Sequence, residues 1–274
     1  MYAVLLAELE DCAVKQSQET TTNLTAKIPI LITSSIKPHD TGVKLLDPQK
    51  RLFHAIESIE QWIRVAPESR LVLCDGSGFD FDPIVRERFP KAIIECLKFN
   101  NDKANISIYG RGYGEGEIIK FALNNSQLLG EAIAFTKCSS KLWVENYAMC
   151  ARNFDDSCAF QGVFGDVFSV TKPIVLTQVD TRFYFVTKAF YLTNLINAHK
   201  AIDLKNGRGL ENVFFEILID LKQANFLLPT PLQIRGVGGG IGTYYKYNYV
   251  RLVKEEIRLE ISKKSTKFLK FFKK

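Results

Sequence analysis

Apolar residues in the first half of the chain follow two alternating patterns, short unbroken runs and helical spacing. The runs fall at residues 27–36, 69–78 and 91–99, and their β-rich composition predicts buried strands. Helical spacing covers residues 47–65 and, more briefly, residues 82–89. The order strand, helix, strand, helix, strand favours an α/β fold in which a parallel sheet is joined by crossover helices.

Both helices open on the dipeptide Asp-Pro. Asp47 before Pro48 predicts an N-cap followed by a first-turn proline, and Asp82 before Pro83 repeats the pattern. The longer helix is amphipathic, so we expect it to cover one face of the sheet. Its apolar face consists of Leu52, Ile56, Ile59 and Ile63, with Trp62 beside them.

The second half of the chain has weaker patterns. Residues 131–147 predict one or two strands with a turn at Ser139–Ser140, and residues 180–198 begin extended and become helical. Residues 207–224 predict a clear helix, and residues 235–247 are a glycine-rich loop that runs into tyrosines. In parallel sheets ligands bind beyond the carboxyl ends of the strands, so we look for the site in the loops at that edge.

Positive charge is concentrated at the end of the chain. The formal net charge is +6, and the last fourteen residues carry six lysines and no acid, so the rest of the chain is balanced. The basic balance therefore describes a tail, and binding of nucleic acid by the fold loses its support. We expect one α/β domain over residues 1–248 and a basic amphipathic helix or tail over residues 249–274.

Cysteine and histidine usage indicates the compartment. The six cysteines form no CxxC pair and the three histidines lie far apart, which argues against a zinc site. Several cysteines fall inside apolar runs, as reduced buried thiols do. No apolar run is long enough to span a membrane, and no basic segment precedes the apolar patch at the start. A cytoplasmic protein is expected.

Four glycines at alternate positions stand in the stretch Tyr109–Ser126, directly before a predicted acidic and apolar helix. Their spacing matches neither the dinucleotide fingerprint nor a phosphate-binding loop. Glu115 and Glu117 at the helix start suit the helix dipole and would repel a phosphate there, so a ribose, a base or a sugar hydroxyl is the better partner. The alternative is a bend that lets the helix pack closely, with both glutamates in solvent.

Eight blocks in a fixed order now support a resemblance. They include ILITSSIKP, DPQKRLFHAIESIEQWI, LVLCDGSGFD and GYGEGEIIKFALNNS, and then FTKCSSKLWVEN, DTRFYFVTKAFY, GRGLENVFFEIL and IRGVGGGIGTYY, from about Ile30 to Tyr245. The order resembles a group of bacterial glycosyltransferases encoded in polysaccharide (O-antigen or capsule) gene clusters. The resemblance implies a GT-A-like, Rossmann-type, mostly parallel sheet flanked by helices.

The resemblance also implies where a nucleotide-sugar donor would bind. The ends of the first two strands would line the nucleotide pocket, and the GYGEGE segment would approach the nucleotide or donor sugar through its backbone. Asp75 would accept hydrogen bonds from the base or ribose, although a turn residue is an equally good interpretation. The donor-binding residues on this reading are Thr33, Ser34, Ser35, Asp75, Ser77, Gly112, Tyr113, Gly114, Glu115 and Glu117, together with Lys137 and Lys141.

One departure from the family pattern concerns the metal. Many such transferases use Asp-x-Asp to hold a divalent ion against the donor pyrophosphate, and the segment AIAFTKCSSKLWV, where it would be expected, contains no aspartate. Lys137 and Lys141 would replace the charge of the metal, or they are ordinary solvated lysines. No metal ligand is assigned, and dependence on Mg²⁺ or Mn²⁺ stays open.

The catalytic base is expected from a carboxylate at a pocket wall. Glu211 follows a glycine-rich turn at a helix start, and Asp180 is the second choice. Transfer with inversion needs one carboxylate to deprotonate the acceptor hydroxyl. Glu211 as a mere first-turn acid is the alternative. Arg182 and Arg208 are candidates to clamp a phosphate or an anionic acceptor.

The function expected from these residues and the resemblance is transfer of a sugar from a nucleotide-sugar donor to a bacterial surface glycan, either lipopolysaccharide O-antigen or capsule. The aromatic and lysine-rich tail suits an anionic membrane, which implies a peripheral protein at the inner face of the inner membrane. A solubilising tail is the alternative. A non-catalytic nucleotide- or glycan-binding assembly protein with a degenerate transferase fold is the rival function, and a methyltransferase is a third.

Overall fold

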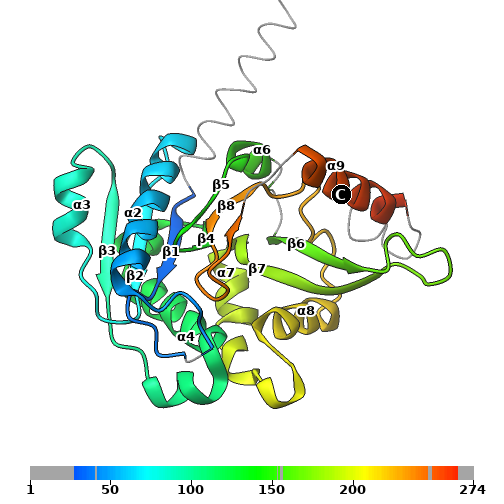
Figure 1. The fold of residues 1–274 in the computed structure, drawn as a ribbon, viewed down its shortest axis with the longest axis horizontal. Coiled ribbons are helices and arrows are strands. Elements are labelled where there is room, and N and C mark those ends of the chain that lie inside the picture. The colour runs from blue at the N-terminus through cyan, green and yellow to red at the C-terminus, as the bar shows by residue number, and fades with distance from the viewer. Residues whose placement is uncertain (1–27, 41, 153, 155–156, 246–248, 265–274) are drawn as a thin grey trace, which may run out of the picture.

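The computed structural model describes residues 28–40, 42–152, 154, 157–245 and 249–264. Its largest element is a six-stranded sheet with the order β3-β2-β1-β4-β7-β6 (Figure 1). Strands β3, β2, β1 and β4 run parallel to one another, and β7 runs antiparallel to both of its neighbours, β4 and β6. These strands are β1 (Ile30–Ser34), β2 (Leu71–Asp75), β3 (Ile94–Lys98), β4 (Ala134–Ser139), β6 (Cys158–Gly165) and β7 (Val175–Thr187). The predicted α/β class and mostly parallel sheet are confirmed.

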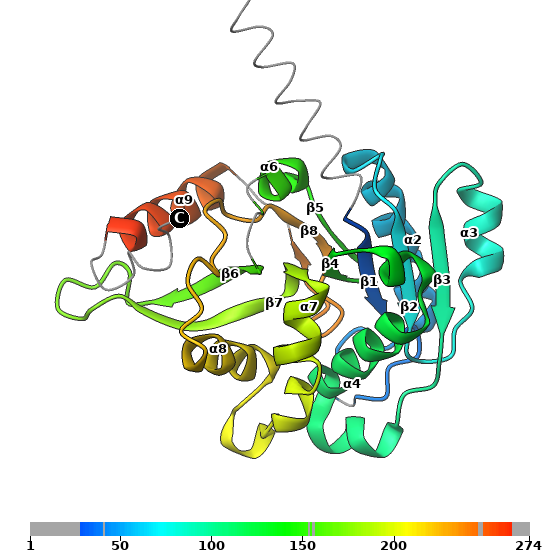
Figure 2. The same ribbon diagram turned by 180° about the vertical axis from the view of Figure 1, so that it is seen from behind.

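Helices cover both faces of the sheet, and each face has its own apolar core (Figures 1 and 2). Ile30 and Ile32 of β1 point to the face covered by α2 (Pro48–Val65) and α3 (Asp82–Arg88). Leu31 points to the opposite face, which is covered by α4 (Lys103–Asn125) and α8 (Leu210–Asp220). Because successive side chains of a strand alternate between faces, an unbroken apolar run is what a strand buried on both sides requires.

Helix α2 begins as its sequence predicts. Asp47 Oδ1 accepts from the backbone N–H of Gln49 at 2.8 Å and of Lys50 at 3.3 Å, and Pro48 is the first helical residue. The second Asp-Pro start differs. Asp82 is the first residue of α3, after Phe81, and pairs with Arg86 at 2.7 Å instead of capping.

The alternate glycines lie inside helix α4, whereas the sequence predicted them before it. Only Gly110 leaves the helical conformation, with φ 74° and ψ −173°, and kinks the helix there. A Cβ on Gly116 would lie 2.3 Å from Cγ of His199, and one on Gly112 would lie 3.1 Å from Cβ of Leu210. The glycines therefore allow α4 to pack closely on the segments that lead into α8.

A second, three-stranded antiparallel sheet has the order β5-β8-β9 and lies beside the end of β4 (Figure 1). The turn at Ser140–Lys141 joins β4 to β5, close to the predicted position. The strands are β5 (Leu142–Val144), β8 (Ile234–Val237) and β9 (Tyr244–Tyr245). The shorter helical elements are α5 (Gln127–Glu131), α6 (Tyr147–Arg152), α7 (Lys188–Phe190), a π-helical turn at Tyr191–Leu195 and 3₁₀ turns at Ala198–Ala201 and Leu204–Asn206.

Helix α9 (Tyr249–Lys264) begins where the sequence predicted a C-terminal helix. Leu259 and Ser262 are buried, and the Arg258 guanidinium lies 5.5 Å from the ring centre of Phe168, so the helix packs against the domain. The rest of the predicted tail, residues 265–274, lies outside the described residues, and the division into domain and tail stays a prediction. None of the described helices is both long and apolar enough to cross a membrane.

Candidate functional site

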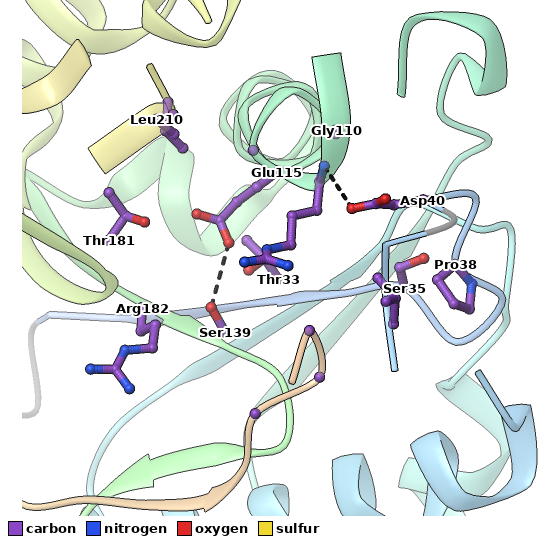
Figure 3. A pocket seen from close by; sticks show the side chains of 18 of the residues that line it. Thr33, Ser35, Pro38, Asp40, Gly110, Glu115, Ser139, Thr181, Arg182 and Leu210 are labelled. Carbon is purple, nitrogen blue, oxygen red and sulfur yellow. Dashed lines mark hydrogen bonds between the residues drawn. The ribbon is translucent and has the colours of Figure 1, made fainter. Parts of the chain in front are cut away.

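A pocket of about 810 Å³ opens at the carboxyl ends of β1 and β4. Helix α4, the start of α8 and the loop between β8 and β9 complete its walls (Figure 3). The carboxyl edge of a parallel sheet is where the sequence placed the site. The predicted site residues that line this pocket are Thr33, Ser34, Ser35, Gly112, Gly114, Glu115, Lys141, Asp180, Arg182 and Glu211.

The end of β1 forms the floor. Thr33 Oγ1 donates to the Cys138 carbonyl at 3.5 Å, whereas the buried Ser34 hydroxyl has no hydrogen-bond partner among the described residues. Asn101, which follows β3, also lines the pocket and is buried. Its side-chain N–H donates to the Gly114 carbonyl at 3.0 Å, and its Oδ1 has no partner in the described part of the chain. Unsatisfied buried polar atoms at a pocket wall suit a polar ligand.

Two buried cations, Arg51 and Lys141, line the pocket, with exposed fractions of 5% and 3%. No carboxylate of the described residues lies within 4.0 Å of either charge. Arg51 Nε donates to the Ser35 carbonyl at 2.7 Å and its Nη1 to the Leu45 carbonyl at 2.8 Å. Lys141 Nζ donates to Ser140 Oγ at 2.6 Å. Buried cations are normally paired with acids, so this pair favours an external anion.

The electrostatics of the pair follow from its burial. Burial lowers the pKa of Arg51 to about 10. Burial, together with the positive charge of Arg51, holds the pKa of Lys141 well below its usual value. A bound anion would stabilise the charged forms of both side chains. Its attraction to this buried pair would be stronger than its attraction to an exposed pair.

The backbone holds Lys141 in an uncommon conformation. Its φ is 72°, in the left-handed region that non-glycine residues rarely adopt. The Val237 N–H donates to the Lys141 carbonyl at 2.9 Å, and a Cβ on Gly236 would lie 2.0 Å from that oxygen. The turn is therefore fixed by the close approach of β8, and strained residues of this kind cluster at functional sites.

The turn at residues 238–240 brings bare backbone against the cations. A Cβ on Gly239 would lie 2.9 Å from Cε of Lys141 and 3.5 Å from Nη1 of Arg51. A Cβ on Gly240 would lie 2.5 Å from Nη1 of Arg111, which is exposed at the pocket. The glycine run thus leaves room for three cationic side chains on one side of the pocket.

Glu115 is one of four carboxylates that line the pocket, with Asp40, Asp180 and Glu211. Its Oε2 lies 2.7 Å from Lys137 Nζ and accepts from the Ser139 hydroxyl at 3.4 Å (Figure 3). Burial raises the pKa of the Glu115 carboxyl and the nearby Glu211 charge adds to this, while Lys137 opposes both. Glu115 is therefore held in place by a cation of its own chain.

Glu211, at the start of α8, is another of these carboxylates. The Thr181 hydroxyl donates to its Oε1 at 3.3 Å, and no cation of the described residues lies within 4.0 Å of it. Asp180 is different, because Arg182 Nε donates to both of its oxygens at 2.9 Å and its Nη2 is also paired with it. Arg182 also stacks on Tyr245 at 4.8 Å. Unlike Glu115 and Asp180, Glu211 thus has no cationic partner among the described residues.

Lys137, a predicted phosphate-binding residue, is not placed where it could contact a ligand in the pocket. It is completely buried, and its Nζ donates to the Thr181 carbonyl at 2.7 Å and to Ser139 Oγ at 3.1 Å, beside the ion pair with Glu115. It does not line the pocket. Lys137 lies within β4, and Glu115, Thr181 and Ser139 already surround its ammonium group, whereas Lys141 follows the strand in the turn and reaches the opening.

Asp75 and Ser77 are also outside the lining. The Asp75 carboxylate accepts from the backbone N–H of Ile36 at 3.0 Å, of Ser77 at 2.7 Å and of Phe79 at 3.1 Å, and from the Ser77 hydroxyl at 2.6 Å. With four donors from its own chain, the completely buried Asp75 stabilises the turn after β2, and its contact with a base or ribose stays a prediction.

Three further candidates lie outside the lining. Glu117 Oε1 lies 2.6 Å from Nε2 of His199, which ties α4 to the 3₁₀ turn at Ala198–Ala201. Tyr113 packs edge-on against His199 at 5.2 Å. Arg208 pairs with Glu216 within the α8 region. All three contacts are structural, within the domain.

Sequence reasoning missed Arg51, Asn101 and Thr181. Arg51 had a signal, because it lies four and eight positions before Ala55 and Ile59 on the buried stripe of α2, where a charge is unexpected. Asn101 and Thr181 had none, since only the fold brings the residue after β3 and the residue in β7 to one pocket.

A divalent metal would need several hard ligands. Among the residues that the structure describes, no group of three or more His, Cys, Asp or Glu side chains converges. Two of the four pocket carboxylates already have a counter-charge, Glu115 from Lys137 and Asp180 from Arg182, so they do not fit a site of the Asp-x-Asp type. The residues present fit a cationic site for an anion better than a metal site.

Comparison with known proteins finds distant structural likeness only. No family model and no curated protein matches the chain. The inositol-1-phosphate CTP transferase from T. maritima matches with a TM-score of 0.46 and 12% identity, over 85% of this chain and 97% of that chain. The glycosyltransferase GlyE from Streptococcus pneumoniae gives 0.42 and 11%, over 74% and 44%. A glycosyltransferase involved in the glycosylation of the major capsid of PBCV-1 gives 0.41 and 10%, over 73% and 80%. With TM-scores below 0.5, these likenesses carry no argument about activity.

Proposed function

We propose that this chain is a nucleotide-sugar-dependent glycosyltransferase. The observation that supports the proposal most is the buried pair Arg51 and Lys141, which lacks a carboxylate partner among the described residues and shares one pocket with the carboxylates Glu115 and Glu211. A donor with a diphosphate next to a neutral sugar would place negative charge beside the cations and hydroxyl groups beside the carboxylates.

The cations would stabilise the leaving group. When the bond between the anomeric carbon and the phosphate oxygen breaks, its electron pair stays on the nucleoside diphosphate, and Arg51 and Lys141 would neutralise that charge. Because both cations are held in a buried site before the reaction, little reorganisation is needed as the charge develops. No metal is required for this step in the proposal.

Glu211 would act as the base. The acceptor hydroxyl oxygen forms the new bond to the anomeric carbon, and its proton passes to a Glu211 carboxylate oxygen. Glu211 is favoured over Asp180 because Arg182 already occupies both oxygens of Asp180. Glu115, fixed by Lys137 and Ser139, would orient a donor-sugar hydroxyl.

The acceptor in this proposal is a bacterial surface glycan, lipopolysaccharide O-antigen or capsule. Its support is the order of sequence blocks described above. The pocket itself offers Arg182 stacked on Tyr245, a flat surface of the kind that sugars contact.

The test is calorimetry with UDP, GDP, CDP and CMP sugars, followed by a transfer assay with the donor that binds. Binding of one donor, lost in Arg51→Met, supports the proposal. Glu211→Gln should keep binding and lose transfer by about 10²-fold or more. If no donor binds at millimolar concentration, the proposal is rejected. Full transfer by Glu211→Gln would remove the base assignment, and donor binding without any transfer would favour the non-catalytic alternative.

A further inference from the structure

The buried ammonium group of Lys137 joins two walls of the pocket from behind. It lies 2.7 Å from Oε2 of Glu115, on α4, and donates to the backbone carbonyl of Thr181, on β7, at 2.7 Å. It also donates to Ser139 Oγ at 3.1 Å, so these contacts account for the three donors of an ammonium group. Glu115 and Thr181, which both line the pocket (Figure 3), are therefore held relative to each other by one side chain.

Thr181 extends this connection to Glu211. While its backbone carbonyl accepts from Lys137, its side-chain hydroxyl donates to Glu211 Oε1 at 3.3 Å. Thr181 is 4% exposed and belongs to β7, which pairs with β4, so the sheet fixes the place of both polar groups. Within the described part of the chain, no other side chain donates a hydrogen bond to the Glu211 carboxylate. The contacts of Lys137 thus reach both carboxylates, one directly and one through Thr181.

A completely buried lysine is rare, because removing an ammonium group from water is costly unless oxygens surround it. Lys137 has those oxygens, and it lies 5.9 Å from the ring centre of Tyr184 as well. A well-packed apolar residue would stabilise a sheet at least as well as a buried ion pair does. The geometry of this lysine therefore suits the fixing of polar groups at the pocket better than it suits stability alone.

The charge of Lys137 also acts on the carboxylates. Burial raises the pKa of Glu115, and the charge of Glu211 raises it further, which means that the two carboxylates are near enough to repel each other. Lys137 opposes both effects. Its charge therefore favours the ionised form of Glu115 in spite of the neighbouring Glu211.

We propose that Lys137 and Thr181 are positioning residues for Glu211. Lys137 fixes the Thr181 peptide group, and the Thr181 hydroxyl holds Oε1 of Glu211, so that Oε2 is directed to the acceptor hydroxyl and receives its proton. The same ammonium group fixes Glu115, the carboxylate that would orient the donor sugar. The inference rests on the proposed function, in which Glu211 is the base.

The test replaces Thr181 in two complementary ways in the full chain. Thr181→Val keeps nearly the same shape and removes the hydroxyl, whereas Thr181→Ser keeps the hydroxyl and removes the methyl group. With the donor that binds in calorimetry, we expect kcat of Thr181→Val to fall about tenfold or more at unchanged donor KM, because the base loses its orientation. Thr181→Ser should recover most of that kcat.

A matched control is Thr136→Val, which also removes a buried hydroxyl. Thr136 precedes Lys137 on β4, and its hydroxyl faces Tyr147 at 3.5 Å, away from the pocket. We expect this variant to keep the kcat of the wild type. A residue that only supports packing would give the reverse result at position 181, since valine packs as threonine does and serine leaves a small void. Wild-type kcat in Thr181→Val, or a loss in Thr181→Ser as large as in Thr181→Val, overturns the proposal.

A second readout needs no turnover. In the chain labelled with ¹³C at the glutamate carboxyl carbons, Glu115→Gln and Glu211→Gln identify the two resonances by their loss. Thr181→Val should move the Glu211 resonance and leave that of Glu115 in place. Because Lys137 opposes the effect of burial on Glu115, Lys137→Met should raise the pKa of Glu115 further.

The two readouts separate this inference from the proposed function. An unchanged Glu211 resonance in Thr181→Val overturns the inference, whatever the activity. If the wild type transfers no sugar, the proposed function is rejected, and a shifted Glu211 resonance would still support the link between Lys137, Thr181 and Glu211.

Discussion

Substitution of Lys141 by methionine should stabilise the protein and weaken its affinity for a diphosphate. Methionine keeps most of the side-chain length and the same strained backbone conformation, so the change removes little except the amine. Lys141 is 3% exposed, has Arg51 as its charged neighbour and has no carboxylate within 4.0 Å among the described residues. The folded state therefore carries a cost of desolvation and repulsion that methionine does not have.

The magnitudes follow from that environment. Desolvation and the repulsion from Arg51 outweigh the attraction of Asp75, so removing the amine should raise the free energy of unfolding by about 1–3 kcal/mol. Losing one buried charge-assisted contact should weaken binding of a nucleoside diphosphate by about 2–4 kcal/mol. That range corresponds to roughly 30- to 700-fold in Kd. Stability and affinity should thus move in opposite directions.

The matched control is Lys137→Met, four residues earlier in the chain and within β4. Lys137 is also buried, but its ammonium group is 2.7 Å from Glu115 and donates to two further oxygens. Its removal leaves the buried Glu115 carboxylate without its cation, so we expect the free energy of unfolding to fall by about 3 kcal/mol.

Urea titration of both variants measures the stabilities, and calorimetry with the binding donor measures the affinities. Our reasoning is refuted if Lys141→Met destabilises the protein as much as Lys137→Met does. It is refuted as well if Lys141→Met binds the diphosphate with the affinity of the wild type. The first result would mean that Lys141 has a compensating partner, and the second that the anion binds elsewhere.

Three further predictions concern the same pocket. Burial and Arg51 lower the pKa of Lys141, so between that pKa and the usual 10.5 the unfolded chain binds more protons than the folded one. The free energy of unfolding should therefore rise with pH in that window. Urea titrations from about pH 7 to about pH 10 should show the rise in the wild type and not in Lys141→Met. Gly239→Ala should weaken diphosphate binding about tenfold, since its Cβ would lie 2.9 Å from Cε of Lys141, while Gly130→Ala, with open space around it, should have no effect in calorimetry. Addition of EDTA should leave the affinity for the donor unchanged if the two cations supply the charge that a metal would; a loss of affinity would assign that charge to a metal.

Most of the fold could be predicted from the sequence because the patterns that indicate its strands and helices are local. The apolar run that forms β1 and the Asp47–Pro48 start of α2 are read within a few residues. The glycines of α4 were misplaced for the same reason. Alternate glycine disfavours a helix by propensity, and only packing against His199 and Leu210, more than eighty residues away, explains why the helix contains them.

By itself, the amino-acid sequence determined the α/β order, the edge of the sheet that bears the pocket, and the concentration of positive charge at the end of the chain. The tertiary structure decided which charges are neutralised. Lys137 and Lys141 look alike in sequence, yet one faces Glu115 and the other faces Arg51. The cost of a buried charge depends on neighbours that come from other strands and helices, and sequence spacing does not encode those distances.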